Sequence, residues 1–406
     1  MNKQLRWSFS VMMFLQYMIW GAWSPDYTDY LQNRLGFSGL QSGSIFSLLP
    51  IGCMLAPVIA GQLADRYFAT EKLLAVLHLA GGVLLMLAAR MTDYRSLWLT
   101  MLGWAILYAP TLALTNSICF HHMPEAEKQF GLVRVWGTIG WIAAGATLSK
   151  VLRAMAPGLL GGLGGFDGLW LAGIASLILG LFSFALPHTP PAQKGGNPWA
   201  FLGAIKMLRD PQFAIFMGIS FVVATELMFY YVLTAPFLYH AGVKTGDAPF
   251  WMAICAQGAE ILTMLALPWM MMKWGLRKTM TVGILAWPIR YAVFALGGPL
   301  WLVIAALTLH GLCYVCFFTA SYIYVNQVAE PDIRASAQGL ITFVTLGAGL
   351  FLGSWFAGFI NDQFTVNGRT DYTKVFLVPL ALTVICAIVF MAFFRERGWK
   401  PQPASA

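Results

Sequence analysis

The sequence predicts an all-α membrane protein with about twelve spanning helices in two six-helix bundles. Of its 406 residues, 59% are hydrophobic and only 10% are charged, whereas a soluble domain carries about 25% charged residues. Apolar runs of about 20 residues, enough to cross a bilayer, alternate with short charged loops. The longest polar stretch follows the sixth run and begins with linker-like proline, glycine and lysine residues. The chain therefore divides into six spans plus six.

The expected spans are centred at about residues 20, 54, 81, 108, 142, 178, 223, 260, 287, 313, 348 and 384. The expected parts are a first bundle (1–186), a cytoplasmic linker (187–210), a second bundle (211–396) and a cytoplasmic tail (397–406). No small-residue cleavage site follows the first apolar run, so we interpret that run as a retained span.

Basic residues set the expected orientation. With the amino terminus inside, the inner loops hold about fifteen Lys and Arg residues and the outer loops about eight. This bias predicts a multi-pass protein of the cell (inner) membrane with both termini in the cytoplasm. The net charge of +8 reflects these loops and does not indicate nucleic-acid binding. Tight cytoplasmic turns of similar composition are expected at 61–66 and 273–278.

Metal, cofactor and enzyme motifs are missing from the sequence. All six cysteines lie in or beside apolar spans. No second Cys or His pair at ligand spacing accompanies Cys313-x-x-Cys316, so we interpret these cysteines as small apolar residues that fill packing space. The metalloprotease, nucleophile-elbow and phosphate-loop patterns do not occur. We expect no metal, no cofactor and no enzyme activity, and we expect a monomer.

Glu260 is the most informative single residue. It lies near the middle of an apolar run whose nearest flanking charges are Asp247 and Lys273. An ionised acid at mid-membrane costs about 2.5–3.5 kcal/mol, so such a group is usually kept for function, and protonation lowers the cost. Gln257 lies one turn earlier on the same face. We predict a polar site here; the alternative is a neutral Glu that only links two helices.

The fifth span places Arg134, Thr138 and Trp141 on one helical stripe. A guanidinium, a hydroxyl and an indole on one face suit a planar polar ligand, because the guanidinium donates hydrogen bonds and the indole stacks on a planar ring. Alternatively, Arg134 is an interfacial anchor that snorkels. Gly137 and Gly140 are expected to permit close helix packing.

Further polar groups interrupt other spans. Gln16 lies in the first span, where Asp26 and Asp29 at the outer end are expected interfacial caps, with cation attraction as the alternative. Glu226 in the seventh span is a second buried acid. His310 in the tenth is a candidate proton carrier, or a neutral packing residue.

The chain resembles the nucleoside:proton symporters of the major facilitator superfamily over most of its length. The matching stretches, in order, are Phe14-Leu-Gln16-Tyr-x-x-Trp20-Gly21-x-Trp23, Tyr108-x-Pro110-Thr111-Leu, Arg134-x-Trp136-Gly137-Thr138-Ile-Gly140, Leu186-Pro187-His188-Thr189-Pro190, Gln257-x-x-Glu260, Ala286-Trp287-x-x-Arg290 and Ile333-Arg334-Ala335-Ser336-Ala337-Gln338-Gly339.

The resemblance implies the major facilitator fold and proton-driven uptake of nucleosides. It implies substrate contacts at Arg134, Thr138, Trp141, Gln257 and Glu260. Departures from the family pattern concern three further places. Met228 and Tyr231 replace two substrate-contacting amides, Val315 replaces an acid important for coupling beside the aromatic Tyr314, and His310 replaces a tyrosine.

We therefore predict a symporter that imports nucleosides or nucleoside-like solutes by alternating access, with the two halves rocking around the bound solute. The substrate-binding candidates are Arg134, Thr138, Trp141, Gln257, Glu260, Tyr231, Tyr314 and Gln16. The proton-coupling candidates are Glu260, His310 and Glu226. The alternatives are a symporter of sugars or other small polar solutes, or a passive facilitator or sensor with the same fold.

Overall fold

The structure is a computed structural model of the chain, and it describes residues 3–63, 68–123, 126–191, 200–330 and 333–396. The end of the expected 61–66 turn, residues 192–199 of the expected linker and the expected tail lie outside these residues.

The described residues form an α-helical membrane fold. Eight helical stretches are long and apolar enough to cross a membrane, and one of them, Ala248–Leu296, is 49 residues long. This stretch is interrupted at Gly275, whose φ of 77° and ψ of 171° are not helical, at the place where a tight turn is predicted. Three further helices, Lys3–Trp23, Ala126–Ala146 and Asp167–Ser183, complete an arrangement consistent with twelve spans. The predicted fold class is confirmed.

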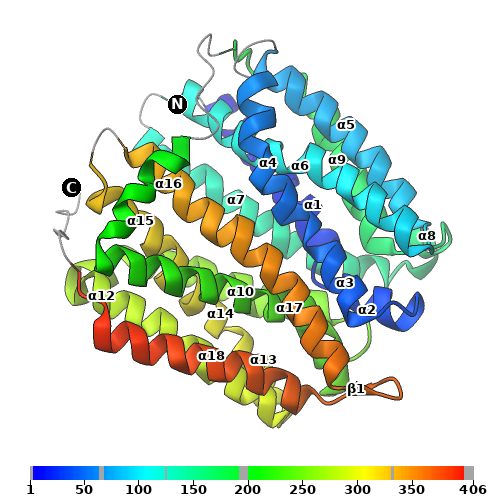
Figure 1. The fold of residues 1–406 in the computed structure, drawn as a ribbon. Helices are drawn as coiled ribbons and strands as arrows, with labels where there is room; N and C mark the ends of the chain where they lie inside the picture. Colours follow the sequence, from blue (N-terminus) through cyan, green and yellow to red (C-terminus); the bar gives the residue numbers. More distant parts are fainter. Residues whose placement is uncertain (1–2, 64–67, 124–125, 192–199, 331–332, 397–406) are drawn as a thin grey trace. The chain divides into compact units, whose positions relative to one another are not determined.

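The first of two compact units comprises residues 1–198 and 244–253. In this unit α1 packs along α7, and α5 along both α6 and α9 (Figure 1). Its elements are α1 (Lys3–Trp23), α2 (Tyr27–Asp29), η1 (Tyr30–Arg34), α3 (Gly39–Phe46), α4 (Leu48–Leu63), α5 (Thr70–Ala89), α6 (Tyr94–His122), α7 (Ala126–Ala146), η2 (Thr147–Leu152), α8 (Pro157–Gly161), α9 (Asp167–Ser183) and α11 (Ala248–Trp251).

The second unit comprises residues 199–243 and 254–406. Here α12 packs along α18, and α10 along α17 (Figure 1). Its elements are η3 (Ala200–Arg209), α10 (Pro211–His240), η4 (Met252–Gln257, which begins in the first unit), α12 (Gly258–Leu296), α13 (Leu300–Leu307), α14 (Leu309–Cys313), η5 (Tyr314–Thr319), α15 (Ala320–Val328), α16 (Arg334–Thr342), η6 (Phe343–Gly349), α17 (Leu350–Gln363), β1 (Thr365–Val366), β2 (Arg369–Thr370) and α18 (Tyr372–Phe393).

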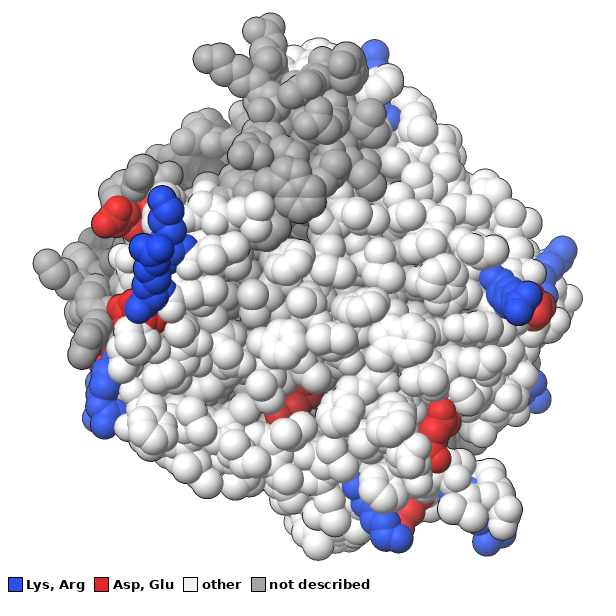
Figure 2. Space-filling model, in the orientation of Figure 1, with Lys and Arg blue, Asp and Glu red and all other residues white. Residues whose placement is uncertain are grey.

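Local sequence signals fix several helix ends. Ser38 and Gln41 form a reciprocal capping box at the start of α3. Asp93 caps α6 by accepting a hydrogen bond from the backbone amide of Ser96. Between the strands of the β1–β2 hairpin, Asn367 and Gly368 both have positive φ, as a tight hairpin turn requires. In Figure 2 the charged side chains lie mostly at the margins of the view, and apart from one acidic patch the surface between them carries none, as expected of a surface that faces lipid.

The close approach of α1 and α7 depends on two glycines. A Cβ at Gly140 would overlap the backbone carbonyl oxygen of Phe14. A Cβ at Gly137 would lie 2.6 Å from the Tyr17 ring. The predicted role of both glycines in close packing is confirmed, and this packing brings the predicted stripe of α7 against α1.

Candidate functional site

The stripe on α7 faces aromatic side chains of α1. The Arg134 guanidinium carbon lies 3.9 Å from the centre of the Tyr17 ring, a cation–π contact. Trp141, 8% exposed, packs edge-on against Trp20 with ring centres 5.3 Å apart. Arg134 and Thr138 are partly accessible. Tyr17, for which the sequence predicts no role, thus holds Arg134 in a defined place within the unit.

Gln16 belongs to a closed polar network inside the first unit. Its amide nitrogen donates to the Thr111 hydroxyl at 2.8 Å, and its amide oxygen lies 2.9 Å from Nε2 of His78. The Tyr108 hydroxyl donates to the Gln16 backbone carbonyl at 2.7 Å, and Nδ1 of His78 lies 3.2 Å from the Ser176 hydroxyl. Gln16 is fully buried. Contact with a ligand would require its amide to leave these hydrogen bonds.

Gln257 and Glu260 lie at a change of helical geometry. Gln257 ends the π-helical segment η4, and Glu260 lies in the first turn of α12. Such π-helical turns are frequent at functional sites. Gln257 is 7% exposed, and Glu260 is partly accessible. Glu260 lies close enough to Tyr230 and Tyr231 on α10 for its charge to act on their hydroxyls.

Arg290 and His310 meet in the interior of the second unit. Nη1 of Arg290 lies 3.3 Å from Nδ1 of His310, and both side chains are fully buried. The guanidinium carbon lies 4.5 Å from the ring centres of Tyr230 and Trp287 and 5.1 Å from that of Tyr291. Three aromatic faces and an imidazole therefore surround one buried cation.

Two predicted substrate residues flank the same imidazole. The ring centres of Tyr231 and Tyr314 lie 6.1 and 5.8 Å from that of His310. Both tyrosines are partly accessible, whereas His310 is not. Tyr314 opens another π-helical segment, η5. The structure thus brings together Tyr231, Tyr314 and His310, which the sequence places on two separate helices.

Glu226 lies on α10 with its side chain fully buried. Neither carboxyl oxygen has a hydrogen-bond partner among the described residues. The Tyr291 hydroxyl instead donates to the backbone carbonyl of Glu226 at 2.6 Å. The predicted buried acid is therefore present in the second unit, adjacent to the Arg290 cluster.

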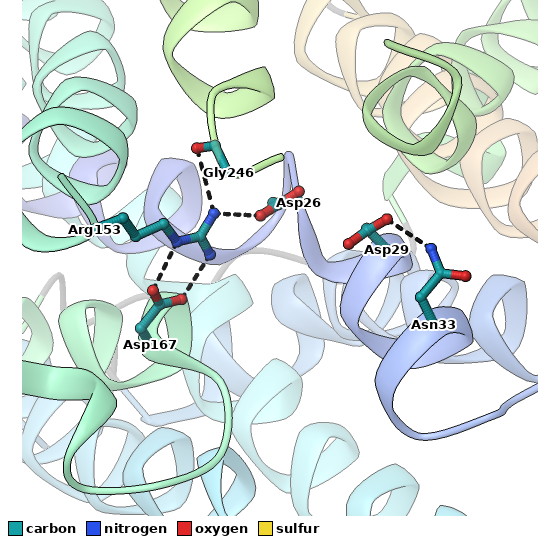
Figure 3. Close-up of polar contacts among 6 residues, drawn as sticks. All are labelled: Asp26, Asp29, Asn33, Arg153, Asp167 and Gly246. Atoms are coloured by element: carbon teal, nitrogen blue, oxygen red, sulfur yellow. Dashed lines mark hydrogen bonds and ion pairs between the residues drawn. The ribbon is translucent and has the colours of Figure 1, made fainter. Parts of the chain in front are cut away.

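A separate ion cluster ties elements of the first unit together outside its long helices (Figure 3). Arg153 donates to both carboxyl oxygens of Asp167 at 2.7 and 2.6 Å and to Asp26 at 2.5 Å. It also donates to the Gly246 carbonyl at 3.5 Å. Burial opposes its charged form, but the hydrogen bonds and charges of Asp167 and Asp26 outweigh this effect and raise the pKa of Arg153. Asp26 is thus paired with an arginine of the same unit.

Neighbouring contacts extend this cluster. Nζ of Lys150 forms an ion pair with Asp247 at 2.8 Å and lies 4.7 Å from the centre of the Phe250 ring. On α2, Asp29 accepts a hydrogen bond from Asn33 at 2.7 Å (Figure 3). Burial raises the pKa of the Asp29 carboxyl, and the hydrogen bond from Asn33 partly opposes that shift.

Sequence reasoning missed three residues that organise these clusters: Tyr17, His78 and Arg153. A histidine in the middle of an apolar run is a recognisable signal, so His78 could have been found. Tyr17 and Arg153 are common residue types for the ends and faces of membrane helices. Their importance depends on which helices pack together.

The fold and its intramembrane polar clusters define a transporter of the major facilitator class. The crystal structure of the nucleoside transporter NupG superposes with a TM-score of 0.85 at 29% sequence identity, covering 98% of this chain and all of that one. A family model described as nucleoside H+ symporter matches residues 1–398, and the chain belongs to this family.

Individual relatives agree with this assignment. The putative nucleoside transporter YegT of Escherichia coli is 35% identical over 408 residues, covering 95% of this chain and 93% of YegT. The nucleoside permease NupG of the same bacterium is 30% identical over 421 residues, covering 98% and 97%. The chain is therefore a multi-pass transporter of the inner membrane and not an enzyme.

Proposed function

We propose that this protein imports nucleosides together with protons by alternating access. The observation that carries the proposal is the match of the nucleoside H+ symporter family to nearly the whole chain. The polar groups predicted from the sequence lie on transmembrane helices, where a carboxylate or guanidinium is costly and usually functional. Moving one proton down a membrane potential supplies about 2.3 kcal/mol per 100 mV, enough to accumulate solute.

The proposed substrate contacts combine stacking and hydrogen bonding. Arg134 and Gln257 supply donors for nucleoside carbonyls and hydroxyls, Thr138 supplies a hydroxyl, and Trp141 supplies a ring that can stack on a base. Glu260 serves both substrate and proton. Further proposed contacts are Tyr231, Tyr314 and Gln16, the last through the network that it holds with His78 and Thr111.

The test is uptake of labelled nucleoside into proteoliposomes with an imposed proton gradient. We expect accumulation that a protonophore abolishes. Glu260→Gln is expected to abolish accumulation and to spare nucleoside exchange, because the amide cannot take up and release a proton. Glu330→Gln, an exposed acid outside the spans, is the matched control. Undiminished accumulation with a normal pH dependence in Glu260→Gln would contradict this role.

Substrate identity is tested with nucleosides, free bases and sugars in parallel. Met228 and Tyr231 stand where the family has amides, so a sugar or other polar solute is the competing cargo. Binding raises the melting temperature of the purified protein by mass action. We expect a shift with nucleosides, and a shift with sugars alone would favour the competing cargo.

The proposal includes three statements about the intact protein. Both termini lie in the cytoplasm, the protein works as a monomer in the bilayer, and the functional halves are 1–186 and 211–396. The excess of basic residues in the loops on the side of the termini supports the orientation. Tags at either terminus should be cleaved only by protease added from the cytoplasmic side.

A further inference from the structure

We propose that Glu226 is a proton-binding residue of the second unit, that Arg290 is its positioning residue, and that His310 stays neutral throughout transport. This proposal rests on the proposed function and chooses between two of its candidate proton carriers. The proposal also gives Arg290 a positioning role, which the proposed function does not include.

The first argument is the environment of the Glu226 carboxyl. The side chain is fully buried, and neither oxygen has a hydrogen-bond partner among the described residues. The nearby Tyr291 hydroxyl donates to the backbone carbonyl of Glu226 and is not directed to its carboxyl. An ionised carboxylate without a donor is among the most expensive groups to bury. The arrangement therefore fits the protonated acid.

The second argument is the environment of the Arg290 guanidinium. This group is fully buried and always charged, and Nε and Nη2 have no acceptor among the described residues. The guanidinium contacts the aromatic faces of Tyr230, Trp287 and Tyr291 and one imidazole nitrogen. Its charge acts on Glu226, although no direct ion pair joins the two. Arg290 thus has donors available for an ionised Glu226.

The third argument concerns which nitrogen of His310 can hold a proton. A guanidinium has only donors, so Nδ1 of His310 must accept the hydrogen bond from Arg290 at 3.3 Å. The ring then carries its single proton on Nε2 and is neutral. A second proton would break this bond and place two cations side by side in a low-dielectric interior. As long as Arg290 keeps this contact, His310 cannot serve as the carrier.

These contacts define two alternative states of one guanidinium. With Glu226 protonated, Arg290 is held by His310 and the aromatic rings. When the proton leaves Glu226 for water, the new carboxylate competes with the His310 nitrogen for the Arg290 donors. Proton release would therefore change the contacts between α10, α12 and α14, and proton uptake from water would restore them.

Other titratable groups near Glu226 do not provide a second carrier. Those whose charges interact with Glu226 are Arg290 and Tyr291 on α12 and Cys386 on α18. The other titratable residues of α17 and α18 lie near helix ends: Asp362, Tyr372 and Lys374. Segment η6 contains no titratable residue, and the charges of η3 precede the start of α10. Tyrosine and cysteine titrate above the physiological range unless strongly perturbed. Glu226 is the acid that this cluster can use.

The test measures protons and nucleoside together in proteoliposomes, with a luminal pH dye and labelled nucleoside. Glu226→Gln should take up fewer protons per nucleoside and lose proton-driven accumulation at least tenfold, while nucleoside exchange continues. His310→Asn should leave the proton-to-nucleoside ratio unchanged. Arg290→Lys, which keeps the charge, should retain a proton-dependent uptake that Arg290→Gln loses or shifts along the pH axis.

An unchanged ratio and pH profile in Glu226→Gln would overturn the proposal. So would loss of proton coupling in a folded His310→Asn protein. If Glu226→Gln does not fold, lost coupling in a folded His310→Asn protein still rejects the proposal, and retained coupling supports its statement that His310 stays neutral. Uptake by the unmodified protein that is insensitive to a protonophore would instead reject the proposed function itself, so the two failures are distinguishable.

Discussion

Arg153 and Asp167 form a two-pronged ion pair, in which Nε and Nη2 donate to the two carboxyl oxygens at 2.7 and 2.6 Å. The same guanidinium reaches Asp26 through Nη1. One arginine therefore neutralises two carboxylates that are 19% and 6% exposed. A bidentate guanidinium–carboxylate pair of this kind provides both directional hydrogen bonds and charge compensation.

Replacing Arg153 should destabilise the folded protein strongly. Arg153→Met leaves two largely buried carboxylates without a cation, and breaking a buried pair costs about 3–5 kcal/mol. Lys150→Met is the matched control, because Lys150 is 42% exposed in its pair with Asp247 and such pairs contribute about 0–1 kcal/mol. Thermal unfolding in detergent measures both. Equal losses in the two variants would contradict the importance of the cluster.

Adding one methyl group to α7 should lower stability strongly at Gly140 and not at Gly131. In Gly140→Ala the new Cβ overlaps the Phe14 carbonyl, so the two helices must separate, at a cost of about 1–3 kcal/mol or more. In Gly131→Ala, on the same helix, the Cβ meets nothing within 4 Å, and alanine favours the helix. Melting temperatures should fall for the first variant and stay level or rise for the second.

The Tyr17 ring should affect nucleoside affinity without touching nucleoside. Tyr17→Leu removes the cation–π contact that holds Arg134, a contact of about 0.5–2 kcal/mol, so affinity should fall between about twofold and thirtyfold. Tyr17→Phe keeps the ring and is expected to bind almost normally. Binding titrations on detergent-solubilised protein compare them. A Tyr17→Phe protein as weak as Tyr17→Leu would show that the hydroxyl matters and the ring does not.

The cap of α6 should give a pH-dependent contribution to stability. The Ser96 backbone amide and hydroxyl donate to Asp93 and hold the pKa of its carboxyl below the ordinary value. Because the pKa of Asp93 is lower in the folded protein, its carboxylate stabilises the fold at pH values above the unfolded-state pKa of about 3.9. This stabilisation is lost as the pH falls through the folded-state pKa. The advantage of the natural protein over Asp93→Asn in melting temperature should therefore shrink as the pH falls below about 3.9 and vanish once the pH is below the folded pKa. A difference that persists unchanged in acid would contradict the charge effect.

Patterns along the chain were sufficient to predict the fold. Apolar run lengths gave an all-α membrane protein, and the glycine with basic neighbours at 273–278 predicted the turn now observed at Gly275. The spacing of Gly137 and Gly140 predicted close packing because small residues are needed wherever backbones approach. These are local features, and local sequence determines them.

The pairing of polar side chains could not be predicted in the same way. Arg290 contacts His310 and three aromatic rings, and no pattern along the chain indicates these partners. Twenty residues separate this arginine from the histidine, and their contact depends on how α12 and α14 pack. Glu260, in contrast, was recognisable because an acid in an apolar run is conspicuous whatever surrounds it. Its proposed role remains a prediction.

The short stretch 244–253 comes late in the chain but packs with the first unit, while Val243 before it and Ile254 after it belong to the second. Its backbone at Pro249 lies against Gly145, and Asp247 bonds to Lys150. If the gene were cut within the linker and the two pieces were produced separately, the later piece would carry ten residues that pack with the earlier one. The two polypeptides should therefore find each other in the membrane without a covalent tether.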